Sequence, residues 1–471
     1  MKKNSFEWVT LDNAGKVFPG QSIRNWANVF RVSVRLREGV EPELLQRALE
    51  KTFLRIPTLR VCIKKGFFWH YFERNEMELT VKHDIKNFCY RIHFKENNGY
   101  LIRVYYHGCQ ISVDFYHALC DGYGGAVFLS TLTGEYLRLK GNSISCNSFV
   151  LNTDDEPPKN EQEDAYIRYA TGDTKSNLVD TFVYHSKGTK EGTYMCNYTA
   201  AVMSFSKLHA LSKSYGVTLT EFLAAVLADV HYRKQKDEGK RPKEVSVQIP
   251  VNLRNFFPSE TLRNFVLCVQ VKIDPRKKDY TFEETVKAVS SQLRQVNSKK
   301  AHHSYITHTV KIGTDAIKLI PLALKTLIIK TGFTFGAEYS TTALLSNLGP
   351  ITLPDDMSEH VEGFSFYTGP GLVNGARCGA VSFGDRFVIT FSDIYKENDI
   401  EKEFLRKLTE MGMEIAVETN RKDDFTSVSG VSAGDKNAFS DEVFIPSKND
   451  KVKQKKADIS FSERLKRDFH L

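Results

Sequence analysis

The sequence predicts a mixed α/β protein with two lobes. Its 471 residues exceed the length at which a single hydrophobic core stops growing, so two lobes are expected. Hydrophobic residues make up 41% and charged residues 26%, which is typical of a globular chain and excludes a disordered or fibrous one. Segments with strand-like and helical periodicity alternate along the chain, and a strand followed by a helix opens each predicted lobe.

The first lobe is predicted to span residues 1–150. Its opening strand, Ala27–Arg37, alternates apolar and polar residues, and apolar residues at helical spacing predict a helix over Pro42–Phe53. Gln110–Tyr116 has the composition of a buried strand, and a helix is expected directly after it, over Gly122–Leu139. Further short strands are expected around Leu59–Ile63, Phe67–Phe72, Glu78–Lys82 and Tyr100–Tyr106.

A change in composition separates the lobes. Residues 151–197 contain an acidic, proline-containing stretch, which predicts a surface crossover. The second lobe is expected over residues 198–420, where the spacing of Thr218 and Glu221 predicts a capping box. After this the periodicity stops, and the tail 421–471 is predicted to be disordered. Within the second lobe we expect strands at Thr199–Phe205, at Glu244–Val251 and through Thr341–Ile394, and helices at Ser206–Gly216, Phe282–Val296, His308–Ile329 and Ile400–Val417.

Charge and cysteine usage limit the partners and the compartment. Lys and Arg outnumber Asp and Glu by 65 to 57, and the two signs are interleaved, so we expect no nucleic-acid partner. Eight scattered cysteines without a CxxC pair predict reduced core residues and a cytoplasmic location. The N-terminus lacks the apolar segment of a signal peptide. The most hydrophobic stretch, Ala316–Phe335, is interrupted by lysines and a proline, so we expect no transmembrane segment.

The segment Phe115–Gly122, with the sequence FYHALCDG, is the main candidate for chemistry. His117 directly follows the predicted buried strand, which would hold its imidazole on a rigid scaffold at the edge of a sheet. Asp121 and Gly122 then turn the chain into a helix. A general base needs such a fixed, neutral imidazole with space for a substrate. A buried histidine followed by an aspartate that caps the next helix would account for the same residues.

This segment resembles the HxxxDG active-site motif of the chloramphenicol-acetyltransferase-like superfamily. That superfamily includes condensation domains of nonribosomal peptide synthesis, alcohol acetyltransferases, wax ester synthases and plant acyltransferases. Three other segments resemble it and follow in the same order, so that the resemblance covers roughly residues 5–418. They are Ile56–Arg60 (IPTLR) after the first helix, Ile249–Arg254 (IPVNLR) with Asn264 and Phe265 beyond it, and Leu345–Pro350 (LSNLGP).

The resemblance implies a fold and a mechanism. The fold would be α/β, of the α+β sandwich type, with two lobes that each hold a mixed sheet with helices, arranged around a central tunnel. The acyl donor would enter from one side and the acceptor from the other, without a bound cofactor or an acyl-enzyme intermediate. His117 would take the proton of the acceptor as it attacks the thioester and return it to the leaving thiolate.

The resemblance also implies roles for individual residues. Asp121 would be structural and would pair with Arg254, because a buried carboxylate needs a compensating cation. Ser346 and Asn347 are the candidates for steadying the oxyanion or contacting the acceptor. No residue is assigned to the donor side, and no metal is expected.

Two departures narrow the resemblance. Condensation domains usually have a second histidine directly before the catalytic one, and here that residue is Tyr116, which favours free-standing acyltransferases that use CoA esters. The DFGWG sequence of the plant family is absent. The nearest sequence, Ser382–Asp385 (SFGD), could equally be an ordinary hairpin turn.

Other interpretations of the same residues remain open. His107, Cys109, His117 and Cys120 lie close in sequence, so a zinc site is weighed, although these residues flank and interrupt a strand. Cys120 is weighed as a nucleophile activated by the histidine.

Two cationic segments have a further interpretation. The cluster His302, His303 and His308, beside Lys299 and Lys300, could line an entrance for CoA phosphates or be a solvated surface. Ile317–Gly332, apolar with periodic lysines, could lie on a membrane surface and admit a lipid, or could simply cover the sheet.

The sequence therefore leaves two classes of function. The first is an acyl-CoA-dependent acyltransferase, similar to alcohol O-acetyltransferases, whose cosubstrate is acyl-CoA or a carrier-protein thioester and whose acceptor is a small alcohol or amine. The second is a catalytically inactive, condensation-domain-like binding protein. A monomer is expected, because both lobes that form the site belong to one chain.

Overall fold

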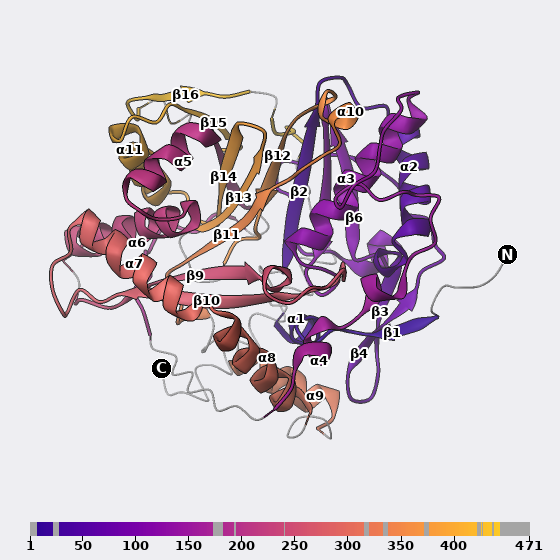
Figure 1. Cartoon of the computed structure of the whole chain (residues 1–471), viewed down its shortest axis with the longest axis horizontal. Coiled ribbons are helices and arrows are strands. Elements are labelled where there is room, and N and C mark those ends of the chain that lie inside the picture. Colours follow the sequence, from indigo (N-terminus) through magenta and orange to yellow (C-terminus); the bar gives the residue numbers. More distant parts are fainter. Residues whose placement is uncertain are drawn as a thin grey trace.

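The computed structural model describes residues 7–21, 28–172, 182–192, 195–239, 241–314, 320–332, 338–371, 376–421, 425, 427–435 and 438–442. The chain folds into two lobes that lie side by side, each with a sheet and helices (Figure 1). This is the fold class that the sequence predicts. None of the helices in these ranges is both long and apolar enough to cross a bilayer.

The first lobe is built on a five-stranded sheet. The strand order is β12-β2-β7-β6-β5, and β2 pairs antiparallel with β7 along its whole length. The strands are β2 (Val29–Leu36), β5 (Lys82–His83), β6 (Ile102–His107), β7 (Gln110–Tyr116) and β12 (Val361–Tyr367). The helices α2 (Pro42–Arg55) and α3 (Gly122–Leu139) pack together beside this sheet, and α3 contacts β2 and β7. A small sheet of β1 (Trp8–Thr10), β4 (His70–Arg74) and β3 (Val61–Lys65) lies at one end of the lobe.

The second lobe is built on an eight-stranded mixed sheet. Its order is β10-β9-β11-β13-β14-β8-β15-β16, with β11 parallel to both of its neighbours. The strands are β8 (Asn197–Ser204), β9 (Val245–Asn252), β10 (Val266–Ile273), β11 (Ala343–Pro350), β13 (Arg377–Phe383), β14 (Arg386–Asp393), β15 (Ile415–Thr419) and β16 (Val431–Ala433). The helices α5 (Phe205–Ser214), α6 (Leu219–Asp237), α7 (Phe282–Val296) and α11 (Asp399–Glu410) pack around it (Figure 1).

Five further α-helices in the described part of the chain are short or peripheral. The crossover contains α4 (Ala165–Tyr169), and the helices α8 (Lys299–Thr314) and α9 (Leu322–Gly332) run along the lower edge of the molecule towards the N-terminal segment (Figure 1). The others are α1 (Phe18–Gln21) and α10 (Asp355–Ser358).

One strand crosses the predicted border between the lobes. β12 belongs to the segment assigned to the second lobe, yet it pairs with β2 at the edge of the first sheet. The close approach of β12 to β13 depends on Gly379, where a Cβ atom would lie 2.1 Å from the carbonyl oxygen of Phe366. The core of the first lobe is therefore completed by residues from the second half of the sequence.

Most predicted elements are present, and β7, α3 and α7 have the expected bounds. The predicted helix Ile400–Val417 is wrong at its end, because the chain reverses at Gly412, which has a φ of 90°, and continues as β15. The boundary at residue 420 also differs from the structure, since β16 extends the sheet beyond it by pairing with β15. Residues 443–471 of the predicted tail lie outside the described residues.

Candidate active site

His117 lies at the end of β7, where the first sheet meets the second lobe. Its backbone N–H donates to the carbonyl oxygen of Asn28 (2.8 Å), so the chain is held as it leaves the sheet. The partly exposed ring stacks on Phe18, with 4.6 Å between the ring centres, and meets the edge of Phe30. The imidazole is thus held between two aromatic rings while part of it stays open.

Hydrogen bonds determine which nitrogen of His117 carries the proton. Nδ1 lies 3.1 Å from Oδ1 of Asn264. The amide of Asn264 is oriented by its Nδ2, which donates to Oδ2 of Asp12 (3.1 Å), so Oδ1 faces the histidine as an acceptor. Nδ1 of His117 must then be the protonated nitrogen, and Nε2 keeps its lone pair.

Burial lowers the pKa of His117 below its ordinary value of 6.5, although its own carbonyl, Asp121, Asn264 and Asp12 oppose this shift. The ring is therefore neutral near pH 7. A neutral imidazole with a fixed tautomer is the form that can accept a proton from a substrate.

Asp12 is a fully buried carboxylate that supports this arrangement. Its Oδ1 accepts from the backbone N–H of Gly15 (2.6 Å), and Nε of Arg263 lies 3.6 Å from Oδ2. Burial raises the pKa of Asp12, and Arg263 is the main opposing influence. The N-terminal segment thereby becomes part of the site.

Asp121 has the structural surroundings that the resemblance implies. Its Oδ1 accepts from the backbone N–H of Gly124 (3.0 Å) and caps α3, and its Oδ2 accepts from the backbone N–H of Phe265 (2.8 Å). The expected ion pair with Arg254 is present, with 2.7 Å between Nη1 and Oδ2. In the part of the chain that the structure describes, no hydrogen bond joins Asp121 to His117.

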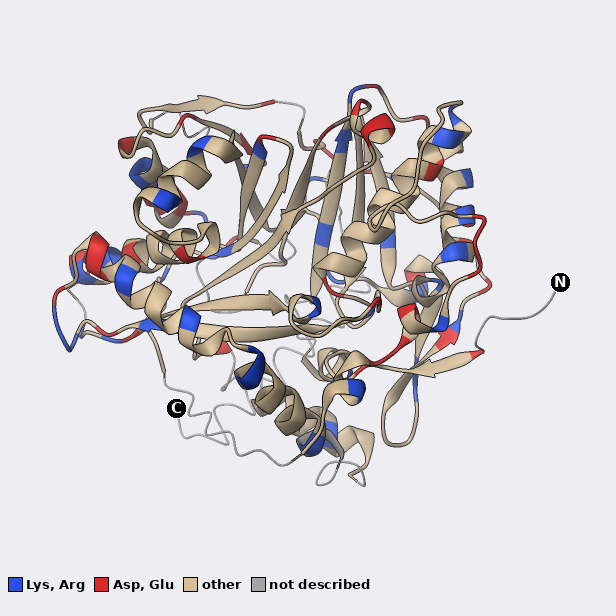
Figure 2. Ribbon diagram, viewed as in Figure 1, with Lys and Arg blue, Asp and Glu red and all other residues tan. Residues whose placement is uncertain are grey.

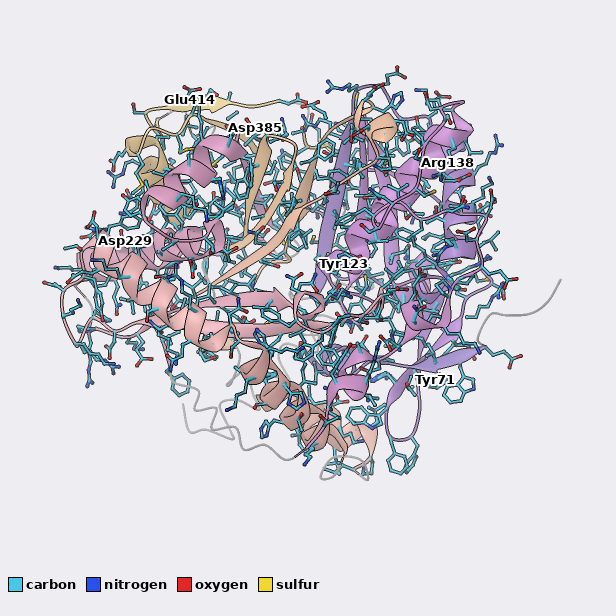
Figure 3. All side chains as sticks on the ribbon, viewed as in Figure 1. Tyr71, Tyr123, Arg138, Asp229, Asp385 and Glu414 are labelled. Atoms are coloured by element: carbon cyan, nitrogen blue, oxygen red, sulfur yellow. The ribbon has the colours of Figure 1, made fainter. Side chains whose placement is uncertain are left out.

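Arg254 connects the two lobes through this ion pair. It follows β9 and donates to the carbonyl oxygens of Thr261 and Arg263 (2.7–3.1 Å). Its guanidinium also lies over the ring of Tyr123, which is seen at the border of the lobes in Figure 3. The ion pair is nearly inaccessible to solvent on both sides, so it is a rigid contact that fixes the start of α3.

Glycines at the start of α3 allow the second lobe to approach it closely. A Cβ atom on Gly122 would lie 2.3 Å from Cδ2 of Leu348, and one on Gly124 would lie 2.1 Å from the carbonyl oxygen of Leu262. A Cβ atom at Gly122 would require Leu348 to change its side-chain position, whereas one at Gly124 would require the backbone to move. Glycine at position 124 is therefore required by the packing of the lobes.

The two oxyanion candidates differ in their surroundings. Both are partly exposed on β11. Asn347 donates to Oγ1 of Thr220 (3.1 Å) and accepts from the backbone N–H of Gly349 (2.9 Å), so its amide is already engaged. Among the described residues, the hydroxyl of Ser346 has no hydrogen-bond partner. Ser346 is the more available donor of the two.

The structure argues against the two alternative chemistries at this segment. Cys120 is fully buried, and burial raises its pKa well above the ordinary value of a thiol, which makes it a poor nucleophile. His107 and Cys109 lie at the far end of β7 from His117, about 20 Å away for a strand of this length. No cluster of three or more His, Cys, Asp or Glu able to hold a metal occurs in the described ranges.

The other sequence candidates have ordinary structural contacts. His302 is buried on α8 and lies 2.8 Å from Oδ1 of Asn297, while His303 contacts the hydroxyl of Thr171. A CoA entrance at this cluster remains a prediction. The segment Ser382–Asp385 is a hairpin turn between β13 and β14, in which Gly384 has a φ of 56°.

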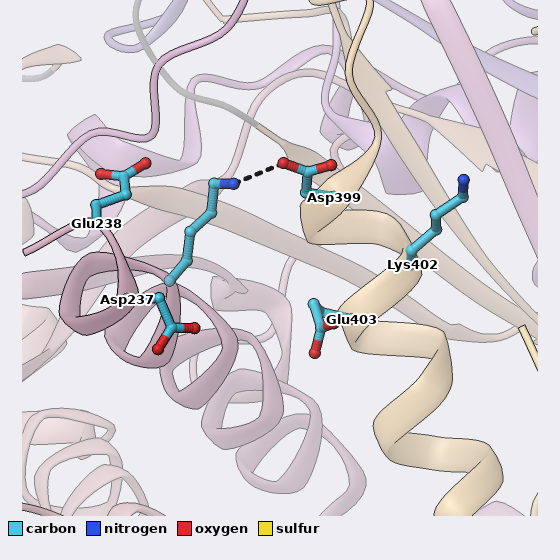
Figure 4. A pocket seen from close by; sticks show the side chains of 6 residues that line it. Asp237, Glu238, Asp399, Lys402 and Glu403 are labelled. Atoms are coloured by element: carbon cyan, nitrogen blue, oxygen red, sulfur yellow. Dashed lines mark hydrogen bonds and ion pairs between the residues drawn. The ribbon is translucent and has the colours of Figure 1, made fainter.

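A charged depression on the second lobe is a less suitable site. It has a volume of about 390 Å³ and lies between the end of α6 and the start of α11 (Figure 4). Lys234 forms an ion pair with Asp399 across it (2.7 Å). Its lining is entirely charged and has no base or nucleophile in a shielded position. The lining residues are Lys234, Asp237, Glu238, Asp399, Lys402 and Glu403.

Three residues around His117 were not predicted to act together. Asn264 appears in the sequence only as part of a resembling segment, and Asp12 and Phe18 carry no motif. Asp12 and Asn264 are both fully buried. Asn264 lies 147 residues from His117 in the sequence and 252 residues from Asp12. Local sequence patterns contain no signal for such a contact.

No protein-family profile matches the sequence, and no curated protein matches it. Solved structures match most of the chain. TRI101 of F. sporotrichioides, in complex with coenzyme A and T-2, matches with a TM-score of 0.58 and 10% identity over 88% of this chain and all (100%) of that protein. TRI3 trichothecene 15-O-acetyltransferase from Fusarium sporotrichioides matches with a TM-score of 0.55 and 11% identity, over 87% of this chain and 96% of that one.

A third match comes from peptide synthesis. The starter condensation domain of rhizomide synthetase RzmA, in complex with C8-CoA and Leu-SNAC, matches with a TM-score of 0.53 and 11% identity, over 86% of this chain and 94% of that one. The similarity extends over both lobes. It confirms the fold predicted from the resemblance, and at this level of identity it speaks for the fold alone.

Proposed function

We propose that this chain, which has the chloramphenicol-acetyltransferase-like fold, is an acyltransferase that moves an acyl group from acyl-CoA or a carrier thioester to a hydroxyl or amine. The observation that carries the proposal is the hydrogen-bonded series Asp12–Asn264–His117. It leaves Nε2 of a neutral imidazole as the available base beside a partly open surface.

The proposed reaction passes through one tetrahedral intermediate. Nε2 of His117 accepts the proton of the acceptor while the acceptor oxygen or nitrogen bonds to the thioester carbonyl carbon. The carbon–sulfur bond then breaks, and the imidazolium returns its proton to the leaving thiolate. A covalent acyl-enzyme is not needed, because acceptor and donor meet in a ternary complex in the tunnel proposed between the lobes.

Other groups have supporting roles in this proposal. Ser346 is the preferred donor to the oxyanion, since the amide of Asn347 already has two partners. Asp121 and Arg254 keep the histidine loop in place and take no part in proton transfer. A reducing, cytoplasmic compartment is consistent with the eight free cysteines. A monomer is proposed because both lobes belong to one chain.

The test is acceptor-dependent thiol release. Purified protein is incubated with short- and long-chain acyl-CoAs and with a panel of alcohols and amines, and free thiol is measured with and without each acceptor. We expect release with at least one pair of substrates, and a loss of about 10²–10⁴-fold in His117→Ala, the usual contribution of a general base. Release that persists in this variant would remove His117 from the mechanism.

The competing function is a catalytically inactive binding protein. It predicts that acyl-CoA binds, as measured by calorimetry, while no acceptor supports thiol release. That result with folded wild-type protein would contradict the proposed transferase.

A further inference from the structure

Helix α9 exposes three of its apolar side chains and buries Lys325. Leu324, Leu327 and Ile328, spaced as one helix face, are 56%, 62% and 53% exposed. Lys325 on the same helix is 0% exposed; its Nζ donates to the carbonyl oxygen of Phe68 and lies 3.8 Å from the ring centre of Trp69. A helix that faces water normally has the opposite arrangement, because exposed leucines gain nothing and a buried ammonium loses hydration.

The neighbouring hairpin adds aromatic side chains to the same surface. The turn between β3 and β4 exposes Phe67 and Phe68, whose rings pack edge to face. The backbone N–H of Leu322, at the start of α9, donates to the carbonyl oxygen of Phe67 (3.0 Å). This bond and the contacts of Lys325 hold the hairpin against α9. We call these exposed side chains the apolar face; they are Phe67, Phe68, Leu324, Leu327 and Ile328.

The charge around the apolar face is positive. The segment Lys299–Gly332 contains six lysines and one aspartate, and neither α8 nor α9 has an Asp or Glu. Figure 2 shows the lower edge of the molecule along these two helices with basic and uncharged residues only. Exposed apolar side chains in a lysine-rich segment are typical of helices that lie in the surface of an anionic bilayer, and they disfavour an acidic or purely polar partner.

We propose that the apolar face docks on the surface of a membrane that contains anionic phospholipids. The eleven residues of α9 are too few to span a bilayer, so the helix would lie in the interface beside the hairpin turn. The side chains of the apolar face enter the boundary of the acyl chains, and exposed lysines of the segment, such as Lys299 and Lys300, contact the headgroups.

The apolar face lies close to His117 through contacts between α9 and α1. Ile329 of α9 packs against Gly20 of α1. A Cβ atom added to Gly20 would lie 2.9 Å from Cγ2 of Ile329. Phe18, on the same short helix α1, stacks on His117. The apolar face is therefore connected to the histidine through one turn of helix. If the proposed acyl transfer takes place here, docking brings His117 near apolar substrates in the bilayer.

The test measures binding to vesicles and needs no catalysis. Full-length protein is sedimented with vesicles of phosphatidylcholine alone or of phosphatidylcholine with phosphatidylserine. We expect stronger binding to the anionic vesicles, weakened by salt. Leu324→Glu and Phe67→Ser should each lower the partition coefficient by about tenfold or more, since each removes an apolar side chain from the interface.

Leu54→Glu is the matched control, because Leu54 is also a helical leucine, 61% exposed, on α2 in another part of the surface. It should bind vesicles as the wild type does, and so should His117→Ala, which separates docking from the proposed chemistry. Absence of vesicle binding, or equal binding by Leu324→Glu and wild type, would overturn the proposal. A dimer in solution that dissociates in Leu324→Glu, without vesicle binding, would instead assign the face to a second copy of the chain.

Discussion

A neutral imidazole can carry its proton on either nitrogen. The hydrogen bonds of Asn264 and Asp12 make Nε2 the basic nitrogen of His117. The amide is the essential link, because it passes the orientation set by the buried carboxylate to the imidazole. The HxxxDG segment predicted the histidine and the paired aspartate. It contained no information on the two residues that set the tautomer, since both come from distant segments.

Replacing Asn264 tests this link. In Asn264→Ala, the imidazole loses a hydrogen bond that raises its pKa, so the pKa of His117 should fall further below 6.5. The acidic limb of the kcat/KM profile should therefore lie at lower pH in the variant than in the wild type. The value of kcat should fall by about tenfold, because part of the population carries the proton on the wrong nitrogen. An unchanged profile and rate would contradict the tautomer argument.

His231, which lies outside the candidate active site, should make the stability of the protein depend on pH. This fully buried residue of α6 has no hydrogen-bond partner for either ring nitrogen among the described residues, and burial lowers its pKa to about 3. In the unfolded chain a histidine titrates near 6.5. Between these two values the unfolded state binds more protons, so the free energy of unfolding falls as the pH falls.

His231→Leu should remove this contribution. When the pH is lowered from 6.5 to 5, the free energy of unfolding of the variant should fall by up to about 2 kcal/mol less than that of the wild type. Denaturant unfolding at both pH values measures this difference. The same variant should be no less stable at pH 7, because a buried polar group without partners is replaced by an apolar one. Parallel curves for the two proteins would show that His231 has partners or solvent in the folded state.

At the scale of elements, sequence periodicity predicted the strand and the helix that carry the candidate site with correct bounds. β7 and α3 are local structures with strong apolar patterns, and the capping box of Thr218 and Glu221 is also present. The periodicity predicts a helix through Val417, which is wrong, because the five residues of β15 become a strand only by pairing with β8 and β16. Short strands near the edge of a sheet depend on partners that a local pattern does not reveal.

Replacing Gly124, at the start of α3, should destabilise the protein more than replacing Gly39. Gly124→Ala should lower the free energy of unfolding by about 1–3 kcal/mol and reduce thiol release, because the new methyl group would collide with the backbone of Leu262 and shift the loop after His117. Gly39→Ala is the control, since no atom lies within 4 Å of its added Cβ. Denaturant unfolding compares them, and equal losses of stability would show that the close approach is not fixed.

At the scale of the whole molecule, the two lobes share structure in both directions. β12 completes the sheet of the first lobe, while Arg254 of the second lobe neutralises Asp121 of the first. The resemblance predicted the ion pair but not the exchanged strand. The strand follows from the path of the chain between β11 and β13, which no motif encodes.

The ion pair between the lobes should contribute strongly to stability. Arg254→Met leaves Asp121 buried without its cation, at a cost of about 3–5 kcal/mol in the free energy of unfolding. Adding Asp121→Asn should restore part of that loss, because the uncompensated charge disappears. Arg406→Met is the control, since its ion pair with Glu410 is exposed on both sides and should be worth no more than about 1 kcal/mol. Additive losses in the double variant would show that the two side chains do not interact.

The sequence by itself determined the two-lobed α/β fold and the placement of His117 after a buried strand, and its resemblance to a known superfamily predicted the pairing of Asp121 with Arg254. These features rest on local periodicity and on short segments whose order along the chain is characteristic. Only the tertiary structure decided the neighbours of the imidazole, the strand shared between lobes and the outward-facing leucines of α9. The first two depend on residues that are far apart in sequence and meet only after folding. The third depends on burial, which periodicity predicts incorrectly for α9, where Lys325 is buried and the leucines are exposed.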